Sequence, residues 1–175
     1  MKVDRKMVKI REMKLNEREM VRKLLIESYI QYEKDFSEER WERYFTEVKY
    51  AVDNDNIDKL YVALLNDQIV GTVQLFPHSN IAYDDFDHSI NAPIIRFLAV
   101  HPNGRGQGIG RLLLDKSISY AQKQRAEAIY LHTTNLMPQA VQLYVQYGFE
   151  REKIYDYDRE NYSILCYKYV IKRYH

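Results

Sequence analysis

Four glycines recur at every second position between an apolar run and an amphipathic one. The apolar run ends at residues 98–100, and Gly104, Gly106, Gly108 and Gly110 follow it. At the start of a helix the backbone N–H groups have no intrahelical partners and lie at the positive end of the helix dipole. Glycines there let a ligand approach the backbone closely, because they have no side chains. The pattern therefore predicts a loop that binds phosphate groups.

The spacing of these glycines differs from that of two common nucleotide-binding loops. The dinucleotide pattern Gly-x-Gly-x-x-Gly is absent, because its last position holds Ile109 when counted from Gly104 and Arg111 when counted from Gly106. No Gly-Lys-Ser/Thr is present to bind a β- or γ-phosphate and a magnesium ion. The sequence thus excludes both of these loops.

Two blocks of residues carry a resemblance to a known family. Arg105, Gly108 and Gly110 form Arg-x-x-Gly-x-Gly, which resembles the acetyl-CoA pyrophosphate loop of the Gcn5-related N-acetyltransferase (GNAT) family. Residues 98–102 read Leu-Ala-Val-x-Pro, as the preceding strand of that family commonly does. The second block is similar to the family's Asn…Ala…Leu-Tyr-x-x-x-Gly-Phe pattern and consists of Asn135, Ala140, Leu143, Tyr144, Gly148 and Phe149.

The resemblance implies that acetyl-CoA, or coenzyme A, is bound as co-substrate, with its pantetheine on the main chain of a strand that splays from its neighbour. A backbone N–H near Val100 would face the oxyanion that develops during acyl transfer. For Arg105 and Asn135 the alternatives are a solvated loop charge and an ordinary turn residue. The residues implied to bind the cofactor are Leu98, Ala99, Val100, Arg105, Gly106, Gln107, Gly108, Ile109, Gly110, Arg111, Asn135 and Ala140.

By the same resemblance, Tyr144 is the general acid that protonates the departing coenzyme A thiolate. A phenol, with a pKa of about 10, is a weaker acid than a thiol at about 8.5, so Tyr144 would act by hydrogen-bonding the sulfur as charge develops. Periodicity places Tyr144 on the inward face of its helix, so the alternative is a core tyrosine. Tyr147, one turn further on, is predicted to be a packing residue.

The general base is where the chain departs from the family pattern. Many members place a glutamate early on the strand before Leu-Ala-Val, but this chain has Ile94 and Ile95 there, followed by Arg96. The alternatives are a chain of water molecules, an amine that arrives neutral, or a histidine. The candidate histidines are His78, His88 and His101.

The acceptor would be the primary amine of a small molecule or a peptide, bound by the elements that vary within the family. Residues 81–90 contain Asp84, Asp85 and Asp87 and no lysine or arginine, so this loop could attract a cationic amine. Its alternative is a solvated loop. Aromatic candidates for the amine pocket are Tyr29, Tyr32 and Tyr83, which core or rim packing would explain equally well.

Periodicity and turn residues predict the elements that position these groups. Asn16 and Glu19 read as a capping box for one helix, and Ser37 caps a second. The glycine loop opens a third helix and Pro138 a fourth. Strands are expected at residues 8–13, 59–65, 69–76, 93–100, 128–133, 150–157 and 162–171, the last two closing a hairpin around residues 158–161. The order β-α-α-β-β-β-α-β-α-β-β predicts one GNAT-like α/β (α+β) domain over residues 1–175, with a mostly antiparallel seven-stranded sheet flanked by about four helices.

Composition restricts the partners. The chain has 26 Lys and Arg against 25 Asp and Glu, which gives no electrostatic footprint for nucleic acid or an anionic membrane. Its one cysteine, Cys166, is predicted to be buried, and it suits a reducing cytoplasm. The five histidines show no metal-ligand spacing, so no metal is predicted. A homodimer is compatible with the family.

These observations predict a cytoplasmic acetyl-CoA-dependent N-acetyltransferase that transfers acetyl directly within a ternary complex. The missing glutamate motivates an alternative, a coenzyme A-binding sensor or regulatory module with little or no turnover. A nucleic-acid-binding domain is a weaker alternative, which the near-zero net charge disfavours.

Overall fold

The computed structural model of the chain describes residues 7–159 and 162–173. Its strands are β1 (Val8–Glu12), β2 (Lys59–Leu65), β3 (Gln68–Phe76), β4 (Ile94–Val100), β5 (Ala128–Thr134), β6 (Glu150–Arg151), β7 (Tyr157–Arg159) and β8 (Tyr162–Val170). In the described residues these form one sheet in the order β1-β2-β3-β4-β5-β8-β6, and β7 pairs with β8 beside this path. Neighbouring strands are antiparallel, except that β4 and β5 are parallel.

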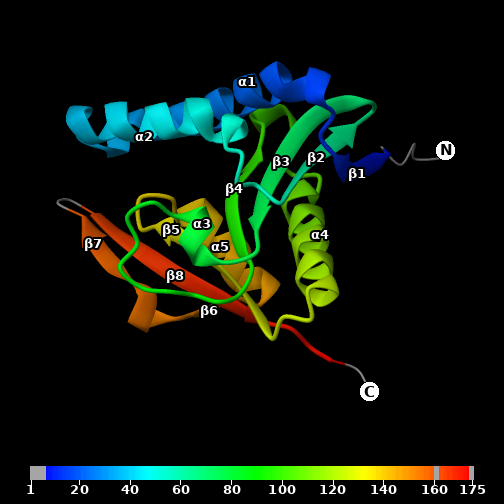
Figure 1. The fold of residues 1–175 in the computed structure, drawn as a ribbon. Coiled ribbons are helices and arrows are strands. Elements are labelled where there is room, and N and C mark those ends of the chain that lie inside the picture. Colours follow the sequence, from blue (N-terminus) through cyan, green and yellow to red (C-terminus); the bar gives the residue numbers. More distant parts are fainter. Residues whose placement is uncertain (1–6, 160–161, 174–175) are drawn as a thin grey trace.

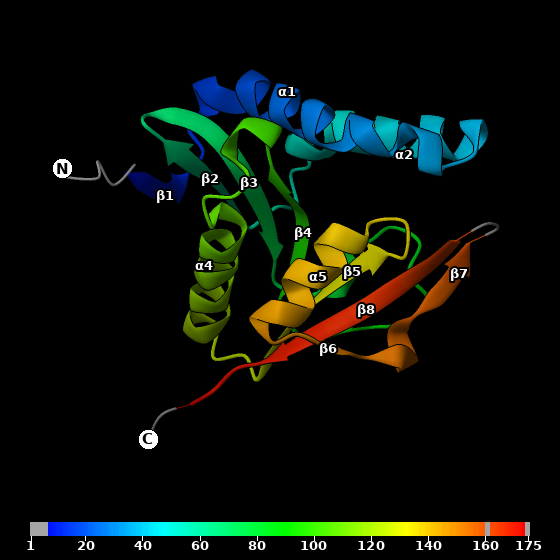
Figure 2. The ribbon, with the colours of Figure 1, turned by 180° about the vertical axis from the view of Figure 1, so that it is seen from behind.

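Helices cover both faces of this sheet. They are α1 (Arg18–Tyr29), α2 (Glu38–Tyr50), the single turn α3 (Ser79–Ala82), α4 (Ile109–Lys123) and α5 (Pro138–Tyr147). Figure 1 shows α1 and α2 side by side across one end of the molecule, and Figure 2 shows α4 and α5 from behind. Successive side chains of β2 point to opposite faces of the sheet and so belong to two separate hydrophobic clusters. Ala63 packs with Leu113 of α4, whereas Val62 packs with Val21 of α1.

The predicted fold class is confirmed, with one difference in the strand count. The run predicted as a single strand over residues 150–157 is broken into β6, the 3₁₀ turn η5 (Lys153–Tyr155) and β7. Asp156 explains the break, because its Oδ1 accepts the N–H of Cys166 on β8 at 2.7 Å and its carboxylate pairs with Arg151. The sheet therefore has eight strands among the described residues instead of seven. Of the predicted turn, residues 160 and 161 lie outside the described residues.

The capping box predicted at Asn16 and Glu19 is wrong, because the box is formed by Lys14 and Glu17, two residues earlier in the chain. The Glu17 carboxylate accepts the N–H of Lys14 at 2.8 Å and pairs with Arg11 of β1 at 2.7 Å. A 3₁₀ turn, η1 (Leu15–Glu17), therefore precedes α1. The Ser37 cap is confirmed, since its hydroxyl accepts the N–H of Arg40 at 3.4 Å.

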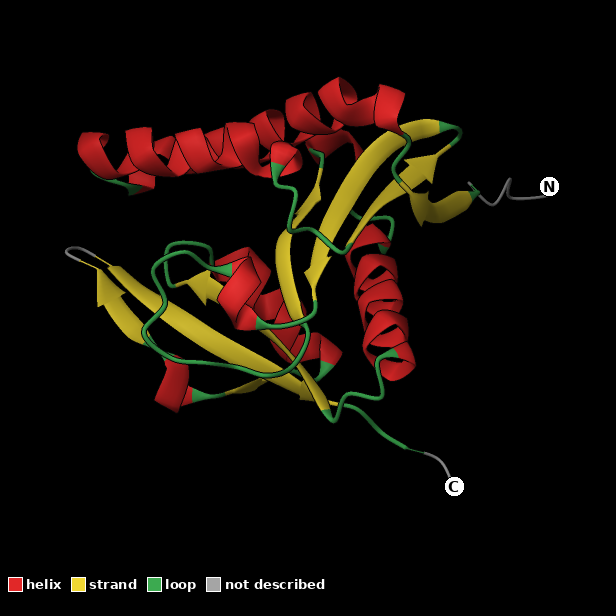
Figure 3. Cartoon of the chain, viewed as in Figure 1, coloured by secondary structure: helices red, strands yellow, loops and turns green. Residues whose placement is uncertain are grey.

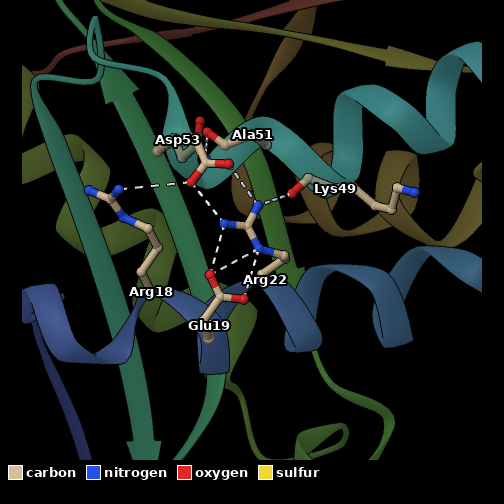
Figure 4. A network of polar contacts seen from close by, with 7 residues as sticks. Arg18, Glu19, Arg22, Lys49, Ala51 and Asp53 are labelled. Carbon is tan, nitrogen blue, oxygen red and sulfur yellow. Dashed lines mark hydrogen bonds and ion pairs between the residues drawn. The ribbon is translucent and has the colours of Figure 1, made fainter.

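Arg22 of α1 joins the two N-terminal helices (Figure 4). Its guanidinium donates to both carboxylate oxygens of Asp53 at 2.8 Å, to Glu19, and to the carbonyl oxygen of Lys49 at the end of α2. Asp53 belongs to the 3₁₀ turn η3 (Ala51–Asp53), which follows α2. Because a bidentate arginine–carboxylate pair fixes geometry as well as charge, this network sets the position of α2 against α1.

A long loop leads from α3 back into β4 and runs over β5 and β7 (Figure 3). The sequence showed no periodicity in this segment, and α3 is its only helical turn in the described residues. Phe86 attaches the loop, with its ring centroid 5.1 Å from that of His132 on β5 and 6.1 Å from that of Tyr157 on β7. The loop thereby brings Tyr83 and Asp85 to the open end of the sheet.

Candidate functional site

Strands β4 and β5 separate after a short parallel contact. They pair only at Ile94 with Tyr130 and at Ile95 with Leu131. Immediately afterwards Phe97 adopts a φ of 49°, and the register with β3 shifts opposite residues 72–74. This is a β-bulge, which turns the rest of β4 away from β5. The predicted splay is therefore present, and it opens the sheet beside Leu98.

The glycine loop leaves backbone donors free at the start of α4. Gly106 and Gly108 both have a φ of 74°, and a Cβ built on either would meet nothing within 4 Å. In the described chain, the first N–H of α4 that donates to a backbone carbonyl is that of Leu112, which bonds the Gly108 oxygen at 3.1 Å. The N–H groups of residues 106–111 have no hydrogen-bond acceptor among the described residues, and Arg105 and Arg111 add positive charge beside them. This arrangement fits a diphosphate group.

One cavity of about 680 Å³ connects this loop with the gap between β4 and β5 and with α2. The loop, β4 and α5 line its donor half. The acceptor half is lined by α1, the 3₁₀ turn η2 (Ile30–Asp35), α2, the loop before β4, β7 and β8. The volume is within the range of small-molecule sites, and the split sheet allows two molecules to meet in it.

Four tyrosines, one buried and three half-buried, gather where the two halves meet. The ring centroid of Tyr29 lies 6.2 Å from that of Tyr32 and 6.0 Å from that of Tyr44. Burial raises the pKa of Tyr29, Tyr44 and Tyr144 above the ordinary value, because a phenolate would lose its hydration. All three hydroxyls are therefore neutral hydrogen-bond donors at physiological pH.

A family model described as "Acetyltransferase (GNAT) family" matches residues 19–149. The chain belongs to this GNAT acetyltransferase family. The match confirms the predicted family and enzyme class, and it spans all of the cavity except its β7 and β8 wall. A search of curated protein sequences finds no significant match.

Solved structures confirm the GNAT fold at low sequence identity. A histone acetyltransferase HPA2-related protein from Corynebacterium glutamicum has a TM-score of 0.71 at 16% identity, covering 95% of this chain and 97% of that one. A GNAT acetyltransferase from Staphylococcus aureus has a TM-score of 0.67 at 20% identity, covering 95% and 100%. PaiA N-acetyltransferase from Thermoplasma acidophilum, solved in complex with coenzyme A, has a TM-score of 0.64 at 19% identity, covering 93% and 99%.

Most residues predicted for the site line this one cavity. From the predicted cofactor set these are Leu98, Ala99, Val100, Arg105, Gly106, Gly108, Ile109, Gly110, Arg111 and Ala140. From the predicted catalytic and acceptor sets they are Tyr144, Tyr29, Tyr32, Tyr83 and Asp85.

Four predicted residues do not line it. Gln107, Asp84 and Asp87 are exposed outside the lining, although the Gln107 backbone still belongs to the glycine loop. Asn135 accepts the N–H of Ser163 at 3.1 Å through its Oδ1, and this bond attaches the end of β5 to β8. The structure therefore gives Asn135 a structural contact where the resemblance implied a cofactor contact.

None of the three candidate histidines lines the cavity. Nε2 of His101 lies 2.6 Å from Glu27, and its Nδ1 accepts the N–H of Asn103. The ring of His88 is tilted against that of Phe86, with centroids 5.6 Å apart, and His78 also lies outside the lining. His132 does line the cavity, but both of its ring nitrogens are hydrogen-bonded and burial lowers its pKa.

Sequence reasoning missed the charged residues of the acceptor half. Glu47 and Arg40 come from α2, and Arg159 comes from β7. Tyr44 and Tyr162 were missed as well. A helical projection of α2 places residues 40, 44 and 47 on one face, and this was the available signal. Arg159 had no such signal, because it depends on the break between β6 and β7.

Two further findings concern the described residues only. They contain no helix that is long and apolar enough to cross a membrane. They also contain no group of His, Cys, Asp or Glu side chains placed to hold a metal ion. Cys166 is fully buried, as predicted, and burial raises its thiol pKa to about 12.

Proposed function

We propose that this GNAT protein transfers the acetyl group of acetyl-CoA directly to the primary amine of a small molecule or peptide, in a ternary complex. The observation that carries this proposal is the separation of β4 from β5 directly before a loop with free N–H groups. A direct transfer needs both substrates at one place, and the single cavity joins the donor half to the acceptor half. The bound coenzyme A of the PaiA structure supports the choice of donor.

The donor half supplies binding groups from the main chain. The loop from Arg105 to Arg111 would hold the diphosphate through N–H groups and two guanidiniums. Leu98, Ala99 and Val100 would hold the pantetheine along the splayed strand, with a backbone N–H near Val100 for the oxyanion. Gly106 and Gly108 have no side chains that would fill the space in front of this loop. Their positive φ values disfavour other residues at both positions.

Tyr144 would act as the proton donor to the departing sulfur. It is 7% exposed and lines the cavity from α5, close to the donor loop. Because burial raises its pKa, the phenol keeps its proton until the thiolate develops charge beside it. As the C–S bond of the thioester breaks, a hydrogen bond from Tyr144 stabilises the leaving group.

Glu47 would receive the proton from the acceptor ammonium. It lines the acceptor half from α2, and only Asp85 offers a second carboxylate in the described lining. The side chain of Glu47 is exposed at the cavity, but partial desolvation there raises its pKa, opposed by Arg96 and Arg159, so it is more basic than an ordinary glutamate. A carboxylate on α2 thus compensates for the apolar residues Ile94 and Ile95 on β4.

Two measurements on the purified chain test the proposal. Calorimetry with coenzyme A should detect saturable binding, and a thiol-release assay with acetyl-CoA and a panel of amines should detect acceptor-dependent turnover. Binding without acceptor-dependent thiol favours the sensor alternative. Absence of binding to the folded chain would overturn both.

A cytoplasmic location is part of the proposal and is supported by the single buried cysteine, Cys166.

A further inference from the structure

The acceptor half of the cavity carries more positive charge than negative charge. Across the described lining the charged side chains are six arginines and two carboxylates. Arg105 and Arg111 belong to the donor loop, which leaves four arginines beside Glu47 and Asp85. A polyamine would face this excess of like charge, so the acidic loop alone does not define the preferred acceptor.

Arg96 is held in place at the inner end of this half. Its guanidinium donates to the carbonyl oxygen of Ala82 at 2.7 Å. It also lies 5.1 Å from the ring centroid of Tyr83 and 4.8 Å from that of Phe97. These contacts leave it without a salt bridge to any carboxylate in residues 7–159 and 162–173. A fixed guanidinium with open donors is preorganised for an anion.

Arg40 and Arg159 face the same region from α2 and β7. Arg40 lies 5.9 Å from the ring centroid of Tyr162, and Arg159 lies 5.1 Å from that of Tyr157. The positive charges of Arg40 and Arg159 oppose the rise in the pKa of the Tyr162 hydroxyl. Those of Arg96 and Arg159 oppose the rise in the pKa of Glu47 in the same way. Arg43, by contrast, pairs with Glu39 at 2.8 Å.

We propose that the acceptor is a small amine that also carries a carboxylate, and that Arg40, Arg96 and Arg159 bind this carboxylate. The inference rests on acetyl transfer in this cavity. A guanidinium matches a carboxylate with two parallel hydrogen bonds, and Glu47 and Asp85 complement the ammonium group of the same molecule. The two carboxylates also favour a singly charged carboxylate over a doubly charged phosphate group there, because they repel the phosphate more strongly.

Matched acceptors test this assignment on the full chain. Each primary amine of the panel is supplied as a carboxylate, as a carboxamide of equal length and as a phosphonate, with a polyamine beside them. We expect kcat/KM for the carboxylates to exceed that for the carboxamides by about 10-fold to 100-fold, as hydrogen bonds to charged groups would give. Equal rates, turnover of carboxamides or polyamines only, turnover of none, or preference for phosphonates would each overturn it.

Variants that each remove one positive charge test whether these arginines cause the preference for carboxylate acceptors. Arg96→Gln and Arg159→Gln should each reduce the carboxylate-to-carboxamide ratio, mainly through KM for the carboxylate acceptor. Lys49→Gln is the matched control, because it removes a positive charge from α2 at a side chain that lies over Phe45, outside the cavity lining. An unchanged ratio in both arginine variants, with folding confirmed by circular dichroism, would overturn the assignment.

Calorimetry with coenzyme A separates this inference from the proposed function. If coenzyme A binds and neutral amines are acetylated as fast as carboxylates, the acceptor assignment fails while acetyl transfer stands. If neither binding nor turnover occurs in the folded chain, the proposed function fails, and the acceptor assignment fails with it.

Discussion

The hydroxyl of Tyr29 lies 3.4 Å from the carbonyl oxygen of Leu98, to which it donates a hydrogen bond. Tyr29 ends α1, and Leu98 follows the bulge in β4. This contact therefore joins the helix of the acceptor wall to the strand segment that has left its parallel neighbour. A half-buried phenol thus links the two walls of the cavity, beside the contact between Glu27 and His101.

Tyr29→Phe should lower the free energy of unfolding by about 1 kcal/mol, because it removes this one hydrogen bond and keeps the ring. Thermal unfolding of the two proteins measures the difference. Tyr50→Phe is the control, since Tyr50 is 61% exposed. Equal losses in both variants would contradict a specific role for the bond between Tyr29 and Leu98.

Gly108→Val should weaken coenzyme A binding more than it weakens folding. A β-branched residue is strained at the φ of 74°, by about 1–2 kcal/mol, and its side chain would occupy the open space before α4. Calorimetry measures the affinity. Gly148→Val, at a φ of 120° outside the cavity, should lose stability while it retains affinity. Full affinity in folded Gly108→Val would contradict the placement of the diphosphate.

Tyr144→Phe should reduce kcat by about 10² to 10⁴ at nearly unchanged coenzyme A affinity, as expected when a general acid is removed. Steady-state kinetics with a fixed amine measures this change. Tyr147→Phe on the same helix is the control, because Tyr147 bonds Asp115 at 2.7 Å and does not line the cavity. A fully active Tyr144→Phe enzyme would remove the assignment.

Glu47→Gln should change the acidic side of the pH–rate profile. The proposed base works only when it is deprotonated, and partial desolvation in the cavity raises the Glu47 pKa above that of an ordinary glutamate. Activity of the wild type should therefore fall as pH drops through this raised pKa. The variant should be slower at high pH and should lack this limb, whereas ionisation of the amine itself affects both proteins. Glu42→Gln, outside the cavity lining on the same helix, should leave the profile unchanged.

Glu17→Gln should destabilise the fold at neutral pH and have a smaller effect in acid. The bond to Arg11 and the N–H of Lys14 hold the Glu17 pKa at about 2, below its ordinary 4.5. A lowered folded-state pKa contributes stability above pH 4.5 and loses it as pH falls from 4.5 toward 2. Denaturant unfolding across this range measures the gap between variant and wild type. An equally large effect of Glu39→Gln, which removes an exposed pair, would contradict the prediction.

The donor half of the site could be predicted from sequence because its groups are contiguous. A strand, a glycine loop and a helix follow one another from Leu98 to Arg111, so spacing alone places their N–H groups. Local chemistry also located Ser37 and Pro138 at helix starts. The capping error at Asn16 has a long-range cause, since Arg11 on β1 fixes Glu17, and no local pattern contains that pair.

The acceptor half could not be predicted in the same way. Arg40, Arg96 and Arg159 meet across three elements that are distant in the sequence, and no spacing rule relates them. The acidic run drew attention to Asp84 and Asp87, which the fold leaves in solvent. The expected glutamate on β4 was absent. A helical projection groups Glu47 with Arg40 on one face of α2, but only the placement of α2 shows that this face lines the cavity.

The left-handed glycines of the donor loop carry a consequence for sequence divergence. A diphosphate site made from backbone N–H groups tolerates replacement of nearly every neighbouring side chain, provided that the backbone keeps its path. Solved structures that share only 16–20% of their residues with this chain have the same fold. In the proposed function, guanidinium and carboxylate groups of the opposite wall select the second reactant, so substitutions there would change the acceptor while the donor site is kept.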